Sequence, residues 1–210
     1  MPDQRRRPTQ ARSQATVAAI LDAATRILRR GGTQALTTNR VAELAGVGIG
    51  SLYGYFQNKA DILDALAEGI LEADELAVHE LLNAAEPDIV GRLVQLLVRR
   101  HRTDRVVRRI VLSHHAARGQ LPAHQDRAMQ MIRLVSEHPT VRSQLSTLDP
   151  ATTFVAAYSI LGVCRALTSL EADASDVKEI EERLADQIRL TLQGRGQLRP
   201  AEMQPRTKAE

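Results

Sequence analysis

The chain has 210 residues, of which 43% are hydrophobic; this is enough for a small domain fused to a medium one, and the absence of Trp makes the expected core aliphatic. A single cysteine, Cys164, excludes an internal disulfide framework and a thiolate metal cluster, so we expect a reducing compartment. The basic N-terminus has no apolar run behind it, and the least polar window, residues 154–170, is broken by Arg165 and several hydroxyl groups. These features predict a cytoplasmic protein with neither a secretory signal nor a membrane span.

The net charge of +3 conceals an asymmetry along the chain. Residues 1–59 hold nine Lys or Arg against three acidic residues, whereas residues 60–210 hold 19 against 22. A basic N-terminal quarter on an acidic remainder indicates a first part that binds a polyanion and a second part of a different kind. A basic face that is only exposed to solvent would carry the same charges. The sequence motifs must therefore distinguish a polyanion-binding surface from such a face.

The first periodic segment predicts a helix over residues 13–30, stopped by Gly31-Gly32. Ahead of it, residues 1–12 form a basic arm that we expect to be flexible. The arm could follow phosphates or enter a minor groove, or it could add only unspecific attraction to DNA. Every later periodic segment is also helical, and the sequence shows no alternating strand pattern, which predicts an all-α protein.

Two short helices separated by a tight turn are expected next. The two threonines that open the segment TTNRVAELAG cap the first helix, and the final glycine of this segment ends it. After a short turn, a second helix is expected from about Gly48 to Tyr55. This arrangement is the helix-turn-helix pattern, at about residues 37–56. It completes a predicted three-helix DNA-binding domain over residues 13–60.

Three of the five aromatic residues of the chain, Tyr53, Tyr55 and Phe56, lie within four positions. Leu52 and Phe56 are four residues apart, so we expect both to face the interior of the small domain. The tyrosine rings can pack while their hydroxyl groups reach phosphates, and Lys59 can neutralise a phosphate. The residues just before them open the second helix, the end that meets base edges in a major groove.

The run from Ile20 to Leu63 resembles the DNA-binding domain of the TetR (tetracycline-repressor-like) family of bacterial transcriptional regulators. The chain reads ILDAA, GG, LTTNRVAELAGVG, GSLYGYF and NK in the order of the family pattern and near its spacing. The close resemblance covers about a quarter of the chain, and the rest is similar only in architecture.

The resemblance implies a set of DNA contacts. One departure is Gly48, where the family usually has Ser or Thr, so that a hydroxyl contact to phosphate is lost while the helix cap is kept. Because Ile49 has no polar group either, we expect sparse direct readout and a contribution from DNA shape. The implied phosphate contacts are Thr38, Tyr53, Tyr55 and Lys59, and the implied base or groove contacts are Asn39, Ile49, Gly50 and Ser51.

A larger helical domain is expected over residues 61–193. Asn58 can cap its first helix, which we expect to reach about residue 85. The tail over residues 194–210 is rich in Gly, Pro and charge and is expected to be disordered. Further helices are predicted at about 88–102, 104–118, 122–137, 139–147, 150–171 and 175–193.

The resemblance implies that the larger domain dimerises and holds a small ligand. Predicted helices 150–171 and 175–193 both carry apolar stripes, and the first also carries a row of small residues. Two such helices from each subunit would form a four-helix bundle, although an intramolecular core has the same pattern. Reading two half-sites requires a two-fold axis, which favours the homodimer.

Candidate ligand contacts are His114, which faces inward, and Tyr158 and Arg165, which lie near one face of their helix. A hydrogen-bonded core histidine and acidic partners across the dimer are the alternatives. We predict no metal at His114-His115, because adjacent helix positions diverge by about 100° and no carboxylate or cysteine follows at the right spacing. With so few aromatic residues, an aliphatic or acyl-type effector is expected. The segment 99–109 has six arginines against one aspartate, and could be a solvated junction, a surface towards the DNA-binding part or an anion site.

Together these patterns predict a ligand-responsive transcriptional regulator that binds a near-palindromic DNA operator as a dimer. The family resemblance implies a repressor that a small-molecule effector releases. A ligand-blind DNA-binding protein is an alternative. A helical-bundle enzyme or carrier is disfavoured, because the sequence offers no nucleophile–base constellation, no phosphate-binding glycine loop and no metal spacing; we expect no cofactor.

Overall fold

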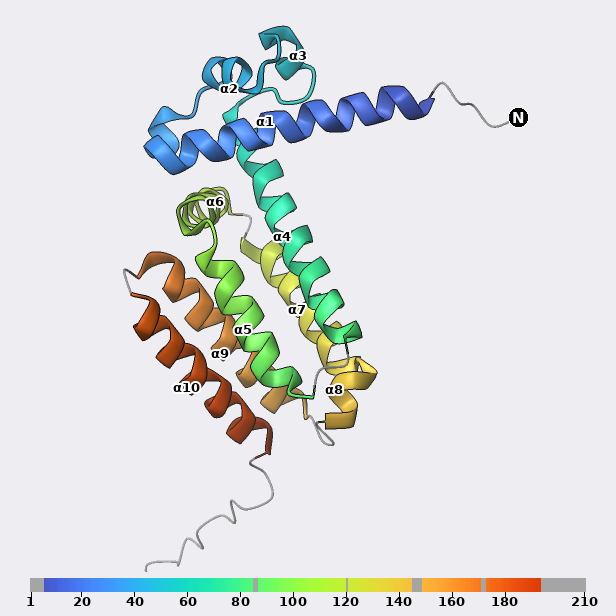
Figure 1. Ribbon diagram of the computed structural model, residues 1–210, viewed down its shortest axis with the longest axis vertical. Helices are drawn as coiled ribbons and strands as arrows, with labels where there is room; N and C mark the ends of the chain where they lie inside the picture. Colours follow the sequence, from blue (N-terminus) through green and yellow to red (C-terminus); the bar gives the residue numbers. More distant parts are fainter. Residues whose placement is uncertain (1–5, 85–86, 120, 145–148, 171–172, 194–210) are drawn as a thin grey trace, which may run out of the picture.

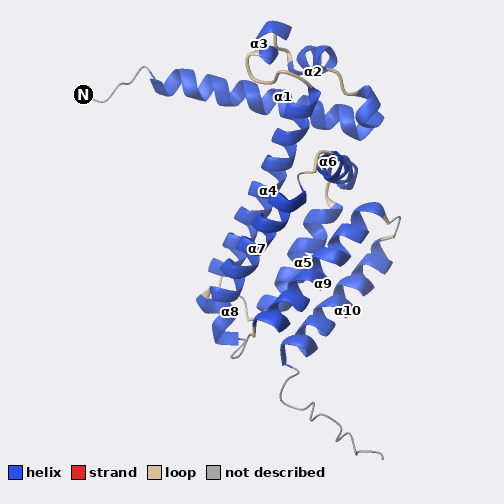
Figure 2. Ribbon diagram, turned by 180° about the vertical axis from the view of Figure 1, so that it is seen from behind, coloured by secondary structure: helices blue, strands red, loops and turns tan. Residues whose placement is uncertain are grey.

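A computed structural model of the chain describes residues 6–84, 87–119, 121–144, 149–170 and 173–193, and within these ranges all regular structure is helical, as predicted (Figures 1 and 2). A small N-terminal unit, here called the head, lies across one end of the long helix α4, and the remaining helices form the body (Figure 1). The head contains α1 (Arg6–Ala35), α2 (Thr38–Ala45) and α3 (Ile49–Tyr53). The body follows α4 (Lys59–Asn83) with α5 (Ile89–Arg102), α6 (Arg105–Ala117), α7 (Leu121–Glu137), α8 (Pro139–Gln144), α9 (Pro150–Ser169) and α10 (Ala174–Gln193).

Helix α1 departs from the prediction at both ends. It begins at Arg6, so the second half of the predicted flexible arm is helical, while residues 1–5 lie outside the described residues. At its other end the helical backbone breaks at Gly32, where φ is 61° and ψ is −163°, and a last turn then reaches Ala35. The predicted stop at the glycine pair is therefore a kink. A glycine suits this position because a positive φ costs it nothing.

The core of the head extends beyond the head itself. Ile20 and Leu28 of α1 are fully buried together with Leu52 of α3 and Ile62 of α4. Val107 and Val111 of α6 belong to the same cluster of buried side chains. Helix α6 therefore packs against α1 and α4 at the junction of head and body, where Figure 1 shows it end-on.

The body is built from two further clusters. One joins α5, α9 and α10, and the other joins α4, α5 and α8 with apolar side chains of α7. Cys164 lies fully buried in the first cluster, where burial raises the pKa of its thiol to about 12. A thiol in this environment stays protonated and behaves as a small apolar side chain.

Helix α4 carries seven acidic residues and one lysine, and cations of the body face it. Asp74 accepts two hydrogen bonds of 2.8 Å from the guanidinium of Arg108 and another from Arg100. Burial by itself raises the pKa of Asp74, but the hydrogen bonds from both arginines outweigh it and hold the pKa below its usual range. Further along, Arg127 of α7 pairs with Glu68 and Glu75.

These contacts also account for part of the arginine-rich segment 99–109. Arg100 and Arg108 point inward to Asp74, and Arg105 donates to the backbone oxygen of Leu170 at 3.1 Å. Asp104, which precedes α6, pairs with Arg29 of the head. The segment thus ties the body to α4 and to the head, rather than forming only a solvated junction.

Helix α9 is long and apolar enough to cross a membrane by length and composition, in contrast to the prediction from the sequence. A single such helix is weak evidence for a span, since the core helix of a soluble protein passes the same test. Only 28% of its apolar window is buried within the subunit, so much of an apolar helix faces outward.

Candidate nucleic-acid interface

The first helix of the helix-turn-helix, α2, is capped at both ends by the predicted residues. The hydroxyl group of Thr37 accepts a hydrogen bond of 3.3 Å from the backbone N–H of Arg40 and so caps α2. Gly46 ends α2 in the left-handed conformation, with φ at 67°, and its N–H reaches the last carbonyl oxygens of the helix. This left-handed residue lets the chain turn within three residues into α3.

Helix α3 ends at Tyr53, two residues before its predicted end, and inward side chains anchor it and the turn that follows. Leu52 is fully buried and Phe56 is 7% exposed, which confirms that the two face the interior. Gly48 is the N-cap of α3, and no side chain caps the helix there, as expected for the family departure at this position. With this anchor, the opposite face of the short helix is fixed in orientation towards solvent.

The predicted base contacts lie on that outer face. Ile49 is 40% exposed, and Gly50 and Ser51 are exposed beside it in the first turn of α3. A Cβ atom added at Gly50 would meet no other atom within 4 Å, so the backbone is open at this point. An exposed isoleucine beside an open glycine allows close approach to a base edge and a thymine methyl group.

The predicted phosphate contacts surround this turn. Tyr53 and Tyr55 are 50% and 41% exposed, unusual for tyrosine rings in a small domain. The hydroxyl groups of Tyr53 and Thr38 lie 3.2 Å apart and share a hydrogen bond, which joins α3 to the start of α2. Asn39 is exposed next to Thr38.

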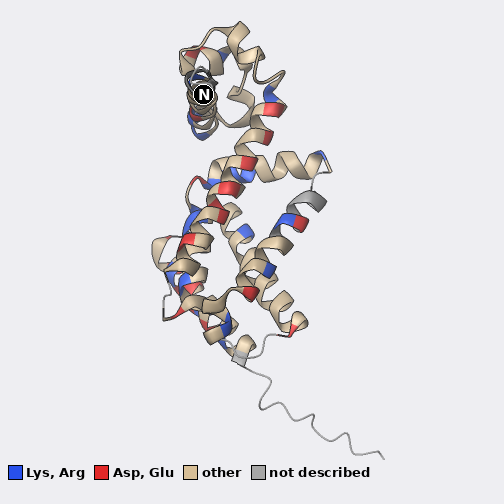
Figure 3. Ribbon diagram, turned by 90° about the vertical axis from the view of Figure 1, so that its right-hand side faces the viewer, with Lys and Arg blue, Asp and Glu red and all other residues tan. Residues whose placement is uncertain are grey.

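Lys59 is exposed in the first turn of α4, close to a positive helix end. Asn58 caps that end: its side-chain oxygen accepts hydrogen bonds from the N–H groups of Ala60 and Asp61 at 2.7 and 3.2 Å. The carboxylate of Asp61 in turn accepts from the N–H of Gln57 at 2.8 Å, one residue earlier than a capping box requires. Figure 3 shows the cationic residues of the head and the acidic residues that follow along α4.

The body contains an apolar cavity of about 160 Å³ between six helices, α4, α5, α7, α8, α9 and α10. Its walls are mostly aliphatic, with Val78, Leu93, Met131 and Ile160 among them, and the hydroxyl groups of Ser136 and Thr153 are its polar members. Sequence reasoning missed this cavity, because each of its residues is an ordinary apolar position on its own helix.

None of the three predicted ligand contacts lines this cavity. The ring of Tyr158 stacks on exposed Phe154, with 4.3 Å between the ring centroids, and Arg165 is exposed on α9. His114 instead contacts Asp64 of α4, at the junction of body and head.

The N-terminal part of the chain is similar in sequence to known proteins. Residues 20–66 match the family described as bacterial regulatory proteins, tetR family. The chain is 34% identical over 92 residues to the HTH-type transcriptional regulator TtgR of Pseudomonas putida, covering 44% of each chain. It is 45% identical over 53 residues to the class C tetracycline repressor protein of Escherichia coli, covering 25% of this chain and 24% of that one. The chain thus spans less than half of the length of these curated relatives.

Solved structures extend the likeness to the body. The fatty acid degradation regulator FadR from Bacillus halodurans superposes with a TM-score of 0.65 at 19% identity, covering 86% of this chain and 96% of that one. The multidrug binding protein EbrR, complexed with malachite green, gives a TM-score of 0.57 at 21% identity, covering 83% and 96%. These superpositions confirm the two-part helical fold, and the family match over residues 20–66 confirms the resemblance seen in the sequence.

Proposed function

We propose that this protein is a ligand-responsive transcriptional regulator of the TetR family that binds a near-palindromic DNA operator as a homodimer. An apolar effector in the body cavity releases it from the operator, so that it acts as a repressor. The observation that carries the proposal is the outer face of α3. There an exposed isoleucine, an open glycine and exposed Tyr53 lie on a helix that buried Leu52 holds from behind, and exposed Tyr55 follows directly after the helix.

Dimerisation through α9 and α10 is supported by apolar surface that the single subunit leaves uncovered. Val155 and Phe154 of α9 are 53% and 49% exposed, and Leu190 of α10 is 70% exposed. Gly162 lies exposed on α9, and a Cβ atom placed there would meet nothing within 4 Å. Small residues beside large apolar ones suit close packing of helices from two subunits. This explains the exposed apolar face of α9 without a membrane.

The effector is assigned to the apolar cavity instead of to His114, Tyr158 and Arg165. Its aliphatic walls fit the expected aliphatic or acyl-type chain, and its two hydroxyl groups suit a neutral or weakly polar end better than a full charge. The multidrug binding of EbrR supports a ligand in the body of this fold.

Helix α4 links the cavity to the DNA-binding surface. It begins with Lys59 beside the helix-turn-helix and lines the cavity with Val78, about five turns further on. Between these points the helix packs into the core of the head through Ile62, Leu63 and Leu66. Two polar contacts, Asp74 with Arg108 and Glu75 with Arg127, then hold it to the body. An effector that favours one position of α4 over another changes the placement of both heads, and a coupling of a few kcal/mol releases DNA.

The DNA-binding surface is tested by Lys59→Ala and Tyr53→Phe. Because each change removes one phosphate contact per half-site, we expect an affinity loss of about fivefold for each half-site. Loss of the lysine charge should also reduce the slope of log K against log salt by about 1 per half-site. The measurement is fluorescence anisotropy with an operator selected from a random DNA pool, at several salt concentrations.

Arg142→Ala is the matched control, since this arginine is exposed on α8, at the opposite end of α4 from the head (Figure 1). It should leave both affinity and salt slope unchanged. Equal effects of Lys59→Ala and Arg142→Ala would show that the start of α4 does not contact DNA.

The cavity is tested by filling it with Ala157→Leu, since Ala157 lines its wall. Short aliphatic esters and alcohols should stabilise the wild-type protein by about 2.7 kcal/mol at a hundred times Kd, or about 5–10 °C in Tm. The variant should lose this shift, because the added side chain occupies the ligand volume. Ala174→Leu, at an exposed position at the start of α10, is the control that should keep it. A shift that survives in Ala157→Leu would place the ligand elsewhere.

A further inference from the structure

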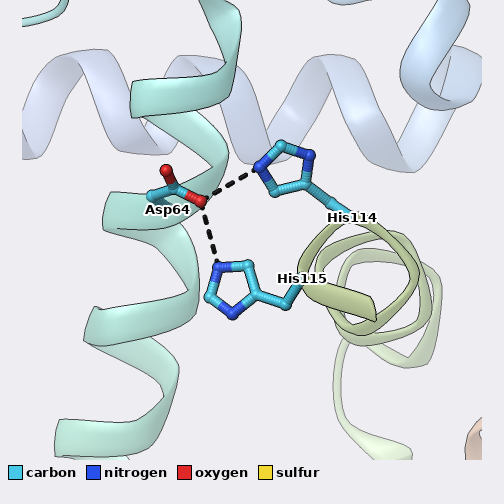
Figure 4. A group of neighbouring side chains, drawn as sticks. All are labelled: Asp64, His114 and His115. Carbon is cyan, nitrogen blue, oxygen red and sulfur yellow. Dashed lines mark hydrogen bonds and ion pairs between the residues drawn. The ribbon is translucent and has the colours of Figure 1, made fainter. Parts of the chain in front are cut away.

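Three side chains from two helices converge at the junction of head and body (Figure 4). Asp64 projects from the second turn of α4, and His114 and His115 lie in the last turn of α6. The Nε2 atoms of His114 and His115 lie 3.0 and 3.1 Å from the same carboxylate oxygen, Oδ1 of Asp64. Sequence reasoning did not find this group, because its carboxylate comes from a residue 50 positions away rather than from the next helical turn.

We propose that Asp64, His114 and His115 form a binding site for a divalent transition-metal ion of the zinc class, which bridges α4 and α6. The three donor atoms lie within 4.8 Å of one another. A Zn²⁺ ion with bonds of about 2.0–2.1 Å needs donors only about 3.3 Å apart, so small side-chain rotations suffice.

The chemistry of the donors selects the ion. Two imidazole nitrogens and one carboxylate are typical ligands of zinc and its first-row neighbours, whereas calcium and magnesium prefer oxygen donors alone. Three protein ligands leave a fourth position for water or another small ligand. The side chain of Asp64 is 32% exposed, so an ion can enter from solvent, while those of His114 and His115 are 16% and 9% exposed and are held in place.

A neighbouring arginine does not exclude a metal ion from the site. Arg118 approaches the cluster, but its Nη2 atom lies 3.9 Å from the other carboxylate oxygen, Oδ2, and its side chain is 47% exposed. It can turn away into water when an ion occupies the site. The rings of His114 and His115 are tilted by 47° with centroids 5.7 Å apart, so both nitrogens can point at one ion without stacking.

An ion at this position would connect α4 and α6, the two helices that support the head. Helices α4 and α6 both contribute to the core of the head, through residues such as Ile62 and Val111. An ion between them ties together the two helices on which the head rests. Binding to the folded state alone therefore stabilises this joint, independently of the apolar cavity and of DNA.

The test is a Zn²⁺ titration of the full chain without a histidine tag, in competition with a chromogenic chelator. We expect one ion per subunit. Asp64→Asn, His114→Ala and His115→Ala should each lower the affinity by about 100-fold or more, since each removes a ligand rather than a supporting contact. In the wild type, Co²⁺ should give the intense visible absorption of a four-coordinate site, and a hundredfold excess of Zn²⁺ over Kd should raise Tm.

His79→Ala is the matched control, because His79 is an exposed histidine on the same helix, α4. It should bind Zn²⁺ as the wild type does. Asp64→Asn keeps an oxygen acceptor for both imidazoles, so it tests the site even if a histidine variant fails to fold. Binding that is absent in the wild type, or that persists unchanged in Asp64→Asn, overturns the proposal, whatever the outcome of the DNA experiments.

Discussion

Replacing Val155 by arginine is expected to leave the subunit folded and to lower its affinity for a two-fold symmetric operator by about 10²–10⁴-fold. Val155 is 53% exposed in the single subunit, so the substitution leaves no cavity there. In the proposed dimer the substitution places two arginines, one from each subunit, in an apolar contact. Burying these unpaired like charges costs more free energy than the interface provides, so the dimer should dissociate. Two heads joined in one molecule bind the second half-site at high effective concentration, and the separated subunits lose this advantage.

The measurement combines light scattering during size-exclusion chromatography with anisotropy on the full operator and on a half-site. The variant should elute as a monomer and bind both DNAs with the same weak affinity. Leu76→Arg is the matched control, since Leu76 is 60% exposed on α4 and outside the proposed interface. It adds the same charge and should remain a dimer. A Val155→Arg protein that stays dimeric would move the interface away from α9.

Replacing Asp74 by alanine should destabilise the fold by about 3–5 kcal/mol, because it leaves the charge of Arg108 buried without its carboxylate. Arg108 is only 8% exposed and gives Asp74 two hydrogen bonds of 2.8 Å. For a chain of this size the loss corresponds to a fall in Tm of about 6–20 °C. Urea unfolding followed by circular dichroism at pH 7 provides the free energy of unfolding.

The pH dependence of this difference has a definite sign. The pKa of Asp74 is lower in the folded protein than the value of about 3.9 expected for an unfolded chain. Its contribution is therefore fully present above pH 3.9 and is lost as pH falls through the lower folded value. The gap between wild type and Asp74→Ala should be the same at pH 7 and pH 5.

Asp22→Ala is the control for this experiment. Asp22 pairs with Arg26 one turn away at 3.0 Å, but both side chains are well exposed, at 65% and 44%. Such a surface pair contributes about 0.3–0.5 kcal/mol. Equal destabilisation by Asp22→Ala and Asp74→Ala would show that the buried contacts of α4 do not hold it to the body.

The helices were predictable because their signals are local. Thr37 and Gly46 were predicted as the caps of α2 and Asn58 as the cap of α4, and the structure has these caps. The inward orientation of Leu52 and Phe56 was predicted from their spacing alone. Periodicity placed the helices of the body to within a few residues, since each needs only an apolar face at 3.6-residue spacing.

The features that could not be predicted from the sequence are formed by residues that lie far apart in the chain. The apolar cavity combines residues of six helices, none distinctive by itself. The prediction against a metal site considered only carboxylates one helical turn after His114 and His115. The carboxylate that contacts both histidines belongs to Asp64, on another helix. The start of α1 was misplaced because the basic, proline-containing sequence before residue 13 has no apolar periodicity, yet its backbone is helical from Arg6.

The sharing of the core of the head with α6 also bears on how the chain folds as it is synthesised. The helix-turn-helix emerges from the ribosome first, but Val107 and Val111, which complete its buried cluster, follow about 50 residues after Phe56. At about 5–20 residues per second, the nascent head waits for several seconds with part of its apolar surface uncovered. An excised fragment that ends shortly after the helix-turn-helix retains this exposed surface permanently. We therefore expect a fragment that contains the DNA-binding surface to be more stable when it extends through α6.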